Sequence, residues 1–247
     1  MELAAKERLE IDAWRNSLHE SPESDSVENL VNKLTDAPVF LEAVERHRDL
    51  FTRARTTLEL GAGQGWASCI LKKLLGTAGH VTASDISPYA MASVWKWERV
   101  FAVRLDGKLN CRSYQVPLPD ASVDLVFTFQ AAHHFVAHRR TLREMLRILV
   151  PGGSCLYLHE PTCAQWIHGV ARRRVNAKGM SVPEDVLVYA RLAALAHEVG
   201  LNVSSVFDLS LSKRGPVELV YYSALTRLPL LRHLLPCTRD IVFMKSR

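Results

Sequence analysis

The sequence predicts an α/β fold in which a doubly wound, mostly parallel sheet of seven strands carries helices on both faces. Three observations support this prediction. Residues 1–55 show only helical patterns, short apolar strands alternate with helices from residue 56 onward, and the first strand runs directly into a glycine-rich turn. Strands that alternate with helices favour parallel pairing, because each crossover helix brings the chain back to the same end of the sheet.

Residues 1–55 are predicted to form an N-terminal helical cap. Apolar side chains follow helical spacing through residues 3–18, and a second such pattern follows in "SVENLVNKL". A third runs through "PVFLEAVERHRDLF", where Pro38 is expected in the first turn, because the N–H that proline lacks has no partner there. We therefore expect three helices before the first strand.

Residues 56–247 are predicted to form the sheet domain. Its first strand is "TTLEL", and the helix "GWASCILKKLLG" follows the glycine turn. The remaining strands are expected in "HVTASD", "LNCRSY", "VDLVFTF", "SCLYLHE", "NVSSVFDLS" and "RDIVFMK", and the remaining helices in "PYAMASVWKWERVFA", "HRRTLREMLRIL" and "PEDVLVYARLAALAHEVG". Ligands of such sheets bind beyond the C-terminal ends of the strands. The stretches 161–183 and 212–236 are insertions in this pattern.

Composition favours an ordinary folded protein of the cytoplasm. The chain has 247 residues, of which 48% are hydrophobic and 23% charged. Its five cysteines lack the close pairs of a zinc site, so we expect neither disulfides nor a bound metal. The N-terminus is too charged for a signal peptide, and no apolar run reaches the ~20 residues of a membrane span. The apolar run near residue 230 contains arginines and leaves peripheral membrane contact open.

A net charge of +5 leaves open an acidic partner. The densest basic cluster is "ARRRVNAK", residues 171–178. Such a short cluster is more often the solvated face of a helix than a phosphate-binding site, so nucleic acid is the lesser alternative.

The turn "LELGAGQG" indicates a ligand that lies against bare backbone. Gly61, Gly63 and Gly65 allow a tight bend without Cβ atoms at the start of a helix, although a plain structural turn would look the same. A dinucleotide loop reads G-x-G-x-x-G, whereas these glycines alternate and Glu59 precedes them by two positions. A carboxylate repels phosphates and attracts an ammonium, so this pattern favours a cationic ligand.

This turn resembles the first motif of the class I S-adenosylmethionine-dependent methyltransferases, in their small-molecule, methyltransferase-11-like branch. The likeness is most specific over residues 56–160, where later motifs follow in the same order. These are "HVTASD", "PLPDASVDLVFTFQAAHHF" and "RILVPGGSCLYLHEP". The resemblance implies a Rossmann-like fold, methyltransferase activity and S-adenosyl-L-methionine as the cofactor.

The resemblance also implies a set of cofactor-binding residues. The glycine loop would pass beneath the methionine part of the cofactor, with Glu59 near its amino group and Gln130 beside it. Asp85 would accept hydrogen bonds from both ribose hydroxyls, and Ile86 would lie beside adenine. The full implied set is Glu59, Gly61, Ala62, Gly63, Gly65, Asp85, Ile86 and Gln130.

One motif departs from the family. Many relatives have Gly-Asp-Ala before the proline-rich turn, and the acid contacts the adenine amino group, but this chain has Cys111-Arg112-Ser113. Arg112 cannot accept a hydrogen bond. Adenine would then be held by backbone groups, by Ser113 or Gln115, or less tightly.

Three histidines are the candidate catalytic residues: His133 and His134 after the fourth strand, and His159 near the end of the fifth. Methyl transfer to a hydroxyl needs an aligned acceptor and a group that removes its proton, and a histidine titrating near neutral pH suits that role. Roles in capping a helix or packing beneath the cofactor, and transfer driven by proximity alone, are the alternatives.

The expected function is methyl transfer to a small-molecule or glycan acceptor, most readily at oxygen, with the insertions 161–183 and 212–236 forming the acceptor pocket. The run Gln130-Ala131-Ala132-His133 lacks the Asn/Asp-Pro-Pro-aromatic motif of enzymes that methylate exocyclic amines, which argues against those substrates. The alternatives are an RNA (tRNA or rRNA) methyltransferase, because of the positive charge, and an inactive methyltransferase-like binding module, because of the missing adenine acid.

Overall fold

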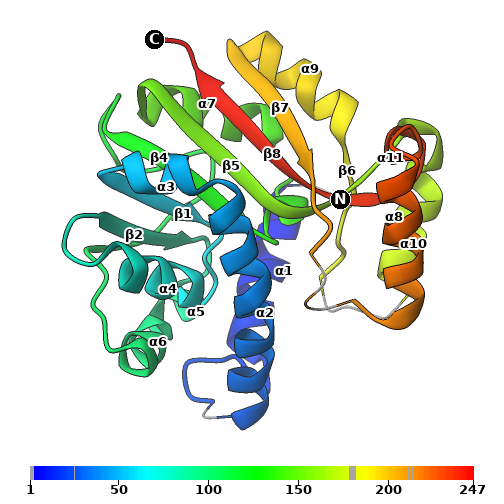
Figure 1. The fold of residues 1–247 in the computed structure, drawn as a ribbon. Helices are drawn as coiled ribbons and strands as arrows, with labels where there is room; N and C mark the ends of the chain where they lie inside the picture. Colours follow the sequence, from blue (N-terminus) through cyan, green and yellow to red (C-terminus); the bar gives the residue numbers. More distant parts are fainter. Residues whose placement is uncertain (1–2, 25, 178–181, 211, 213) are drawn as a thin grey trace.

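One mixed sheet organises the structure. The computed structural model describes residues 3–24, 26–177, 182–210, 212 and 214–247, and Figure 1 shows its ribbon. The strands of the sheet lie in the order β3-β2-β1-β4-β5-β8-β7, and the short β6 pairs with β5. The strands are β1 (Thr56–Leu60), β2 (His80–Asp85), β3 (Gly107–Asn110), β4 (Val123–Phe129), β5 (Leu149–Cys163), β6 (Leu187–Val188), β7 (Leu201–Phe207) and β8 (Cys237–Lys245).

The pairing is parallel from β3 across to β5, and β6 also runs parallel to β5. Strand β8 is antiparallel to both of its neighbours, β5 and β7. The predicted doubly wound, mostly parallel α/β sheet is therefore confirmed, with the two-residue β6 as a strand beyond the seven expected.

Eleven α-helices and two 3₁₀ turns are found in the described part of the chain. The helices are α1 (Leu3–Asn16), α2 (Val27–Arg46), α3 (Arg48–Arg53), α4 (Trp66–Leu75), α5 (Pro88–Ala92), α6 (Val94–Phe101), α7 (His138–Ile148), α8 (His168–Asn176), α9 (Tyr189–Val199), α10 (Pro216–Arg227) and α11 (Leu231–Leu234). The 3₁₀ turns are η1 (Ala132–His134) and η2 (Gln165–Ile167).

Alternating side chains of the central strands divide the core into two layers. Phe127 of β4 packs in one cluster with α2, α3, α4 and α6, whereas its neighbour Val126 packs in another with α7 and α9. Successive residues of a strand point to opposite faces, so strands that are apolar at every position bury both faces of the sheet. Figure 1 shows α2 and α3 in front of the sheet and α7 behind it.

Helix α2 differs from its prediction, because the second and third expected helices are one. The helix runs from Val27 to Arg46 with Pro38 inside it, not in a first turn. An interior proline costs about 3 kcal/mol, because it removes one helical hydrogen bond and crowds the preceding turn. The fully buried Val39 and Phe40 follow it directly, and burying such side chains contributes about 1.5–3 kcal/mol each. Packing on the sheet thus offsets the local penalty.

Other differences lie at element ends. The helix predicted over residues 88–102 is two helices, α5 and α6, which meet at Ser93. The strand predicted over 109–114 ends at Asn110, and residues 187–188, expected within a helix, form β6. No helix among the residues described combines the length and apolar character needed to cross a membrane.

Candidate active site

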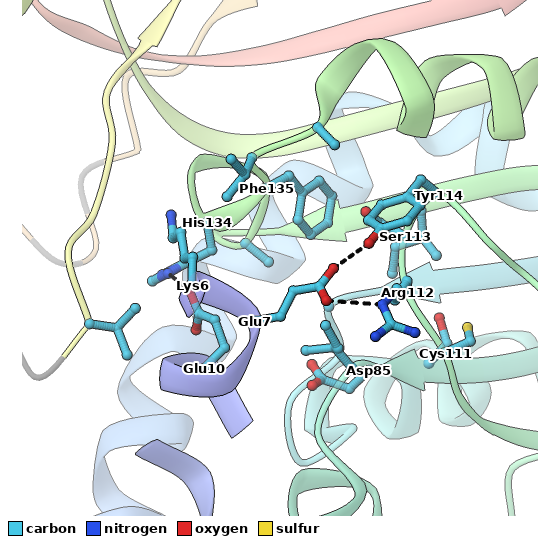
Figure 2. A pocket seen from close by; sticks show the side chains of 18 of the residues that line it. Lys6, Glu7, Glu10, Asp85, Cys111, Arg112, Ser113, Tyr114, His134 and Phe135 are labelled. Carbon is cyan, nitrogen blue, oxygen red and sulfur yellow. Dashed lines mark hydrogen bonds and ion pairs between the residues drawn. The ribbon is translucent and has the colours of Figure 1, made fainter. Parts of the chain in front are cut away.

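A cavity of about 290 Å³ lies at the C-terminal edge of the sheet, where parallel sheets of this kind bind ligands. That volume is close to the lower end of the roughly 300–1,000 Å³ found for small-molecule sites. The ends of β1, β2 and β4 form its floor, and α1 lies across it (Figure 2). Residues as far apart in the sequence as Leu3 and Glu184 therefore meet at this cavity. The floor includes Gly61, Asp85, Ile86 and Gln130 from the predicted cofactor set.

The glycine loop needs its glycines for two separate reasons. Gly61, Gly63 and Gly65 have φ of 67°, 53° and 74°, the left-handed region that favours glycine. A Cβ at Gly61 would lie 2.9 Å from the Cβ of Ala131, and one at Gly63 would lie 2.9 Å from the ring of Trp14. Gly61 lines the cavity, whereas Ala62, Gly63 and Gly65 shape the loop behind it.

Asp85 joins the loop to the cavity. Its Oδ2 accepts a hydrogen bond from the backbone N–H of Gly63 at 2.9 Å, and its Oδ1 accepts one from that of Ser87 at 2.8 Å. Burial outweighs these bonds and raises the pKa of Asp85 to about 6. Its carboxylate retains lone pairs that could accept hydroxyl protons of a ligand. A ribose-bearing cofactor therefore fits this end of the cavity.

Glu59 lies behind the glycine loop, against α4. Its neighbours Leu58 and Leu60 pack on one face of the sheet, and its own side chain reaches α4, where Oε2 accepts hydrogen bonds from the backbone N–H and the hydroxyl of Ser68, at 3.0 and 2.5 Å. It is not one of the described residues that line the cavity. Burial raises its pKa to about 8, so a neutral carboxyl group predominates near pH 7. Its placement gives no support to the predicted contact with an ammonium.

Of the three candidate histidines, His134 faces the cavity. Its Nδ1 lies 2.9 Å from Oε1 of Glu10 on α1. Because Nδ1 is held by a carboxylate, the other ring nitrogen, Nε2, is left for a ligand. Figure 2 shows His134, Glu10 and Lys6 on the same side of the cavity.

His133 is buried behind His134, and the two ring centroids lie 4.3 Å apart. Its Nδ1 lies 2.8 Å from Oε2 of Glu160, whose Oε1 accepts the backbone N–H groups of Ala131 and Ala132. Burial alone would lower the pKa of His133, but the charge and hydrogen bond of Glu160 outweigh it and raise the pKa. Glu160 therefore holds η1, and with it the histidine pair, in position.

His159 lies in a different cluster and does not line the cavity, so its predicted catalytic role stays a prediction that this placement does not support. Its Nδ1 lies 2.5 Å from Oδ2 of Asp208, and Arg46 of α2 binds both Asp208 and Asp240, at 3.0 and 2.8 Å. The β5–β8 register shifts between Tyr157 and Glu160, and His159 has φ of 55°. This irregularity turns the His159 side chain into the charge cluster at the far side of β5, outside the cavity lining.

Helix α1 supplies the other polar wall, which the sequence did not predict. The carboxylate of Glu7 accepts a hydrogen bond from Nε of Arg112 at 3.0 Å and one from the hydroxyl of Tyr114 (Figure 2). Arg112, which stands in place of the usual adenine acid, thus anchors α1. Lys6 is 7% exposed, and burial lowers its pKa. In the sequence, only the spacing of Glu7 and Glu10 by three positions indicates that both acids share one face of the helix. That pattern does not predict a site, because it is common on solvated helices.

The insertions contribute little to this cavity. Val182 lines it from residues 161–183, and none of the described residues of 212–236 does so. In the basic cluster, Arg172, Arg173 and Arg174 are exposed on α8, while Lys178 lies outside the described residues. A role of 212–236 in an acceptor pocket stays a prediction.

Residues 58–157 match the sequence model of the family described as "Methyltransferase domain". A curated relative from Mycobacterium tuberculosis, a probable S-adenosylmethionine-dependent methyltransferase by name, is 32% identical over 44% of this chain and 39% of its own length. The 27-O-demethylrifamycin SV methyltransferase of Amycolatopsis mediterranei is 25% identical over 80% of this chain and 71% of its own length. A ubiquinone/menaquinone biosynthesis C-methyltransferase of Stenotrophomonas maltophilia is 32% identical over 44% of each chain.

Among solved structures, a candidate sarcosine dimethylglycine methyltransferase from Galdieria sulphuraria superimposes with a TM-score of 0.61 over 98% of both chains, at 14% identity, which supports the fold alone. The chain spans about two fifths of the length of the first curated relative. These findings confirm the predicted fold and its S-adenosylmethionine cofactor. The sheet, the order of its motifs and the family match agree that residues 58–157 of this chain resemble a class I S-adenosylmethionine-dependent methyltransferase domain.

Proposed function

We propose that this protein is an enzyme that transfers a methyl group from S-adenosylmethionine to a hydroxyl oxygen of a small-molecule acceptor. The observation that carries this proposal is the pair His134–Glu10, which faces the same cavity as Asp85 and the glycine loop. A base that faces a cofactor cavity is the arrangement that methylation of a hydroxyl requires.

Four residues of the cavity floor would hold the cofactor. Asp85 would accept the ribose hydroxyls, Ile86 would pack beside adenine, and Gly61 and Gln130 would border the methionine part. When bound, the cofactor supplies a methyl group on a sulfonium. The glycine loop keeps this end of the cavity free of side chains, which allows a ligand to approach the backbone.

His134 would act as the general base. With Nδ1–H donated to Glu10, Nε2 carries the lone pair and would take the proton of the acceptor's hydroxyl group. Glu10 would fix this tautomer and stabilise the imidazolium that forms. His133 is less suited, because it is buried and not part of the cavity lining.

The relatives support a small-molecule acceptor but differ on the atom. The rifamycin relative, which aligns with most of this chain, is named for an oxygen position, whereas the ubiquinone/menaquinone relative is named a C-methyltransferase. We favour oxygen, because His134–Glu10 supplies the base that a hydroxyl needs. A glycan hydroxyl is a related acceptor. The exposed arginines of α8 are not part of the cavity lining, so RNA is not favoured.

The test is a transfer assay with methyl-labelled S-adenosylmethionine, in the presence of a chelator. Hydroxylated polyketides, phenols, sugars, quinols and bulk tRNA would be offered as acceptors, and the product atom would be identified by mass spectrometry. We expect label on a hydroxyl oxygen of a small molecule. Label only on carbon would overturn the oxygen assignment, and label only on tRNA would overturn the acceptor class. If calorimetry detects no binding of S-adenosylhomocysteine, the enzymatic proposal as a whole fails.

A further inference from the structure

We infer that His133, His134 and Glu184 form a binding site for one divalent transition-metal ion of the zinc class. One ligand atom from each of the three side chains lies within 4.8 Å of the others. His133 and His134 come from η1, and Glu184 comes from the segment before β6, so the fold brings the group together from positions about fifty residues apart. The sequence predicts no bound metal, because its cysteines lack close pairs and the three ligands here come from two distant segments.

Both histidines are oriented as metal ligands usually are. Glu160 lies 2.8 Å from Nδ1 of His133, and Glu10 lies 2.9 Å from Nδ1 of His134. A histidine ligand commonly donates one ring N–H to a carboxylate, which fixes the tautomer and makes the other nitrogen more basic. Both His133 and His134 have such a carboxylate partner, and this arrangement leaves Nε2 of each ring to bind one metal ion.

The charges around the pair favour a divalent cation. Glu10, Glu160 and Glu184 place three carboxylates around the two histidines, and Lys6 lies on the same cavity wall. Asp185 is paired with His168 and does not need a further partner. Carboxylates on three sides of the two rings favour a bound cation over an anion.

The ligand types select the class of ion. Two imidazoles and one carboxylate suit Zn²⁺, Co²⁺ and Fe²⁺, whereas Mg²⁺ and Ca²⁺ prefer oxygen ligands alone. Three protein ligands leave at least one coordination position open. His134 and Glu184 both line the cavity, so that position would face the cavity interior.

Metal binding here is separate from the proposed methyl transfer. An ion on Nε2 of His134 would occupy the lone pair that a general base uses, so the two roles exclude each other at any one moment. Metal binding is therefore measured on cofactor-free protein, and a failure of methyl transfer leaves its result unchanged.

The test is a calorimetric titration of chelator-treated protein with Zn²⁺, together with visible absorption spectra of the Co²⁺ form. We expect one ion per chain, with an apparent Kd at or below the micromolar range, and Co²⁺ bands that report nitrogen ligands. His134→Ala and Glu184→Gln should weaken Zn²⁺ binding at least tenfold, and Glu10→Gln should weaken it by about 10–100-fold, as loss of a partner of a histidine ligand does.

Two variants serve as matched controls, and folding of each variant is checked by circular dichroism. His197→Ala and Glu218→Gln remove an exposed histidine and an exposed glutamate far from the cluster in sequence, and they should leave Zn²⁺ affinity unchanged. If folded wild-type protein binds no Zn²⁺ at one equivalent, or if folded Glu184→Gln and His134→Ala bind it as tightly as wild type, the site is refuted.

Discussion

Oε1 of Glu10 lies 2.9 Å from Nδ1 of His134, although the two residues are 124 positions apart in the sequence. The contact joins α1 to the turn that follows β4, across the mouth of the cavity. Glu7, three positions before Glu10 on the same helix, binds Arg112. Helix α1 is therefore a wall of the site and a source of its polar groups.

The Glu10–His134 pair predicts a specific kinetic pattern. His134→Ala should lower kcat by about 10²–10⁴-fold while S-adenosylhomocysteine affinity stays within about threefold, because a general base acts on the acceptor in the transition state. Glu10→Gln should lower kcat by a smaller factor, because Nδ1 of His134 keeps a hydrogen-bond acceptor. Single-turnover transfer and calorimetry measure the two quantities. A His134→Ala enzyme that turns over at the wild-type rate would show that proximity alone suffices.

Asp85 predicts that cofactor-product binding weakens in acid. Burial raises its pKa to about 6, and the ionised form is the one that accepts ribose hydroxyl protons. Affinity for S-adenosylhomocysteine should therefore be constant above about pH 7 and fall by about tenfold per pH unit below 6. Asp85→Asn should bind more weakly at neutral pH and lose this dependence. Calorimetry from pH 5 to 8 checks both, and a flat wild-type profile would contradict the assignment.

The buried carboxyl group of Glu59 predicts that the free energy of unfolding falls as the pH rises. Its pKa is about 8 in the folded chain and near 4.5 when exposed, so its contribution to stability is fully present below about pH 4.5 and is lost as pH rises to about 8. Glu59→Gln cannot ionise and can still accept hydrogen bonds from Ser68. The free energy of unfolding of Glu59→Gln, relative to that of wild type, should therefore be higher at pH 9 than at pH 6.

Urea unfolding at pH 6 and pH 9 measures this difference. Glu59→Ala is the companion variant, and it should cost about 1–3 kcal/mol at pH 6, because the buried Ser68 N–H loses its acceptor. If Glu59→Gln were less stable than wild type by the same amount at both pH values, the carboxyl group would have to be ionised throughout, against the raised pKa.

The contact of Gly63 with Trp14 predicts a coupled pair of mutations. Gly63→Ala places a methyl group 2.9 Å from the Trp14 ring at a φ of 53°, so it combines backbone strain with a clash. Gly200→Ala is a control for the strain alone, because Gly200 is left-handed with φ of 92° and ψ of 22°, and the nearest atom to its new Cβ lies 4.0 Å away. Strain alone should cost about 1–2 kcal/mol in both variants.

The clash should add to the cost at Gly63 alone and should disappear in the Trp14→Ala background. A double-mutant cycle by thermal unfolding measures the coupling, which we expect at about 0.5–3 kcal/mol. Additive effects of Gly63→Ala and Trp14→Ala would mean that α1 does not pack on the glycine loop in solution.

The strands were predictable where one residue pattern decides the structure. The predictions for β1, β2 and β4 agree with the structure to the residue, because apolar runs bounded by turn residues leave few alternatives. The prediction that a helix begins at Pro38 was wrong. The burial of Phe40 on the sheet stabilises the longer helix α2, and the local sequence does not reveal such a tertiary contact. Residues 187–188 likewise form β6 because β5 extends to meet them.

The residues of the site also fall into a predictable and an unpredictable group. Asp85, Ile86, Gly61 and Gln130 line one cavity, because each motif sits at the end of a strand and parallel strands end at one edge. The contributions of Glu7 and Glu10 could not be predicted, since local sequence does not specify which strand ends a distant helix will cover. Glu59 was assigned from its charge, but the strand alternation directs it to α4.

The buried charge cluster around Arg46 predicts a stability effect without an effect on cofactor binding. Arg46 binds Asp208 and Asp240, which are both fully buried, and His47 and His159 complete the cluster. Burial alone would raise the pKa of Asp208, but His159 and Arg46 outweigh it, and the pKa is lowered. Arg46→Met should therefore destabilise the fold by about 3–5 kcal/mol, because it leaves buried carboxylates without their cation.

The triple variant Arg46→Met/Asp208→Asn/Asp240→Asn removes those carboxylates together with the cation and should recover most of the loss, since a buried ion pair contributes little beyond its own desolvation cost. Urea unfolding of the single and triple variants measures the difference. Affinity for S-adenosylhomocysteine should match wild type in the triple variant, because none of the three residues lines the cavity. If the triple variant were as unstable as the single one, the cluster would act through its geometry on β8, not through uncompensated charge.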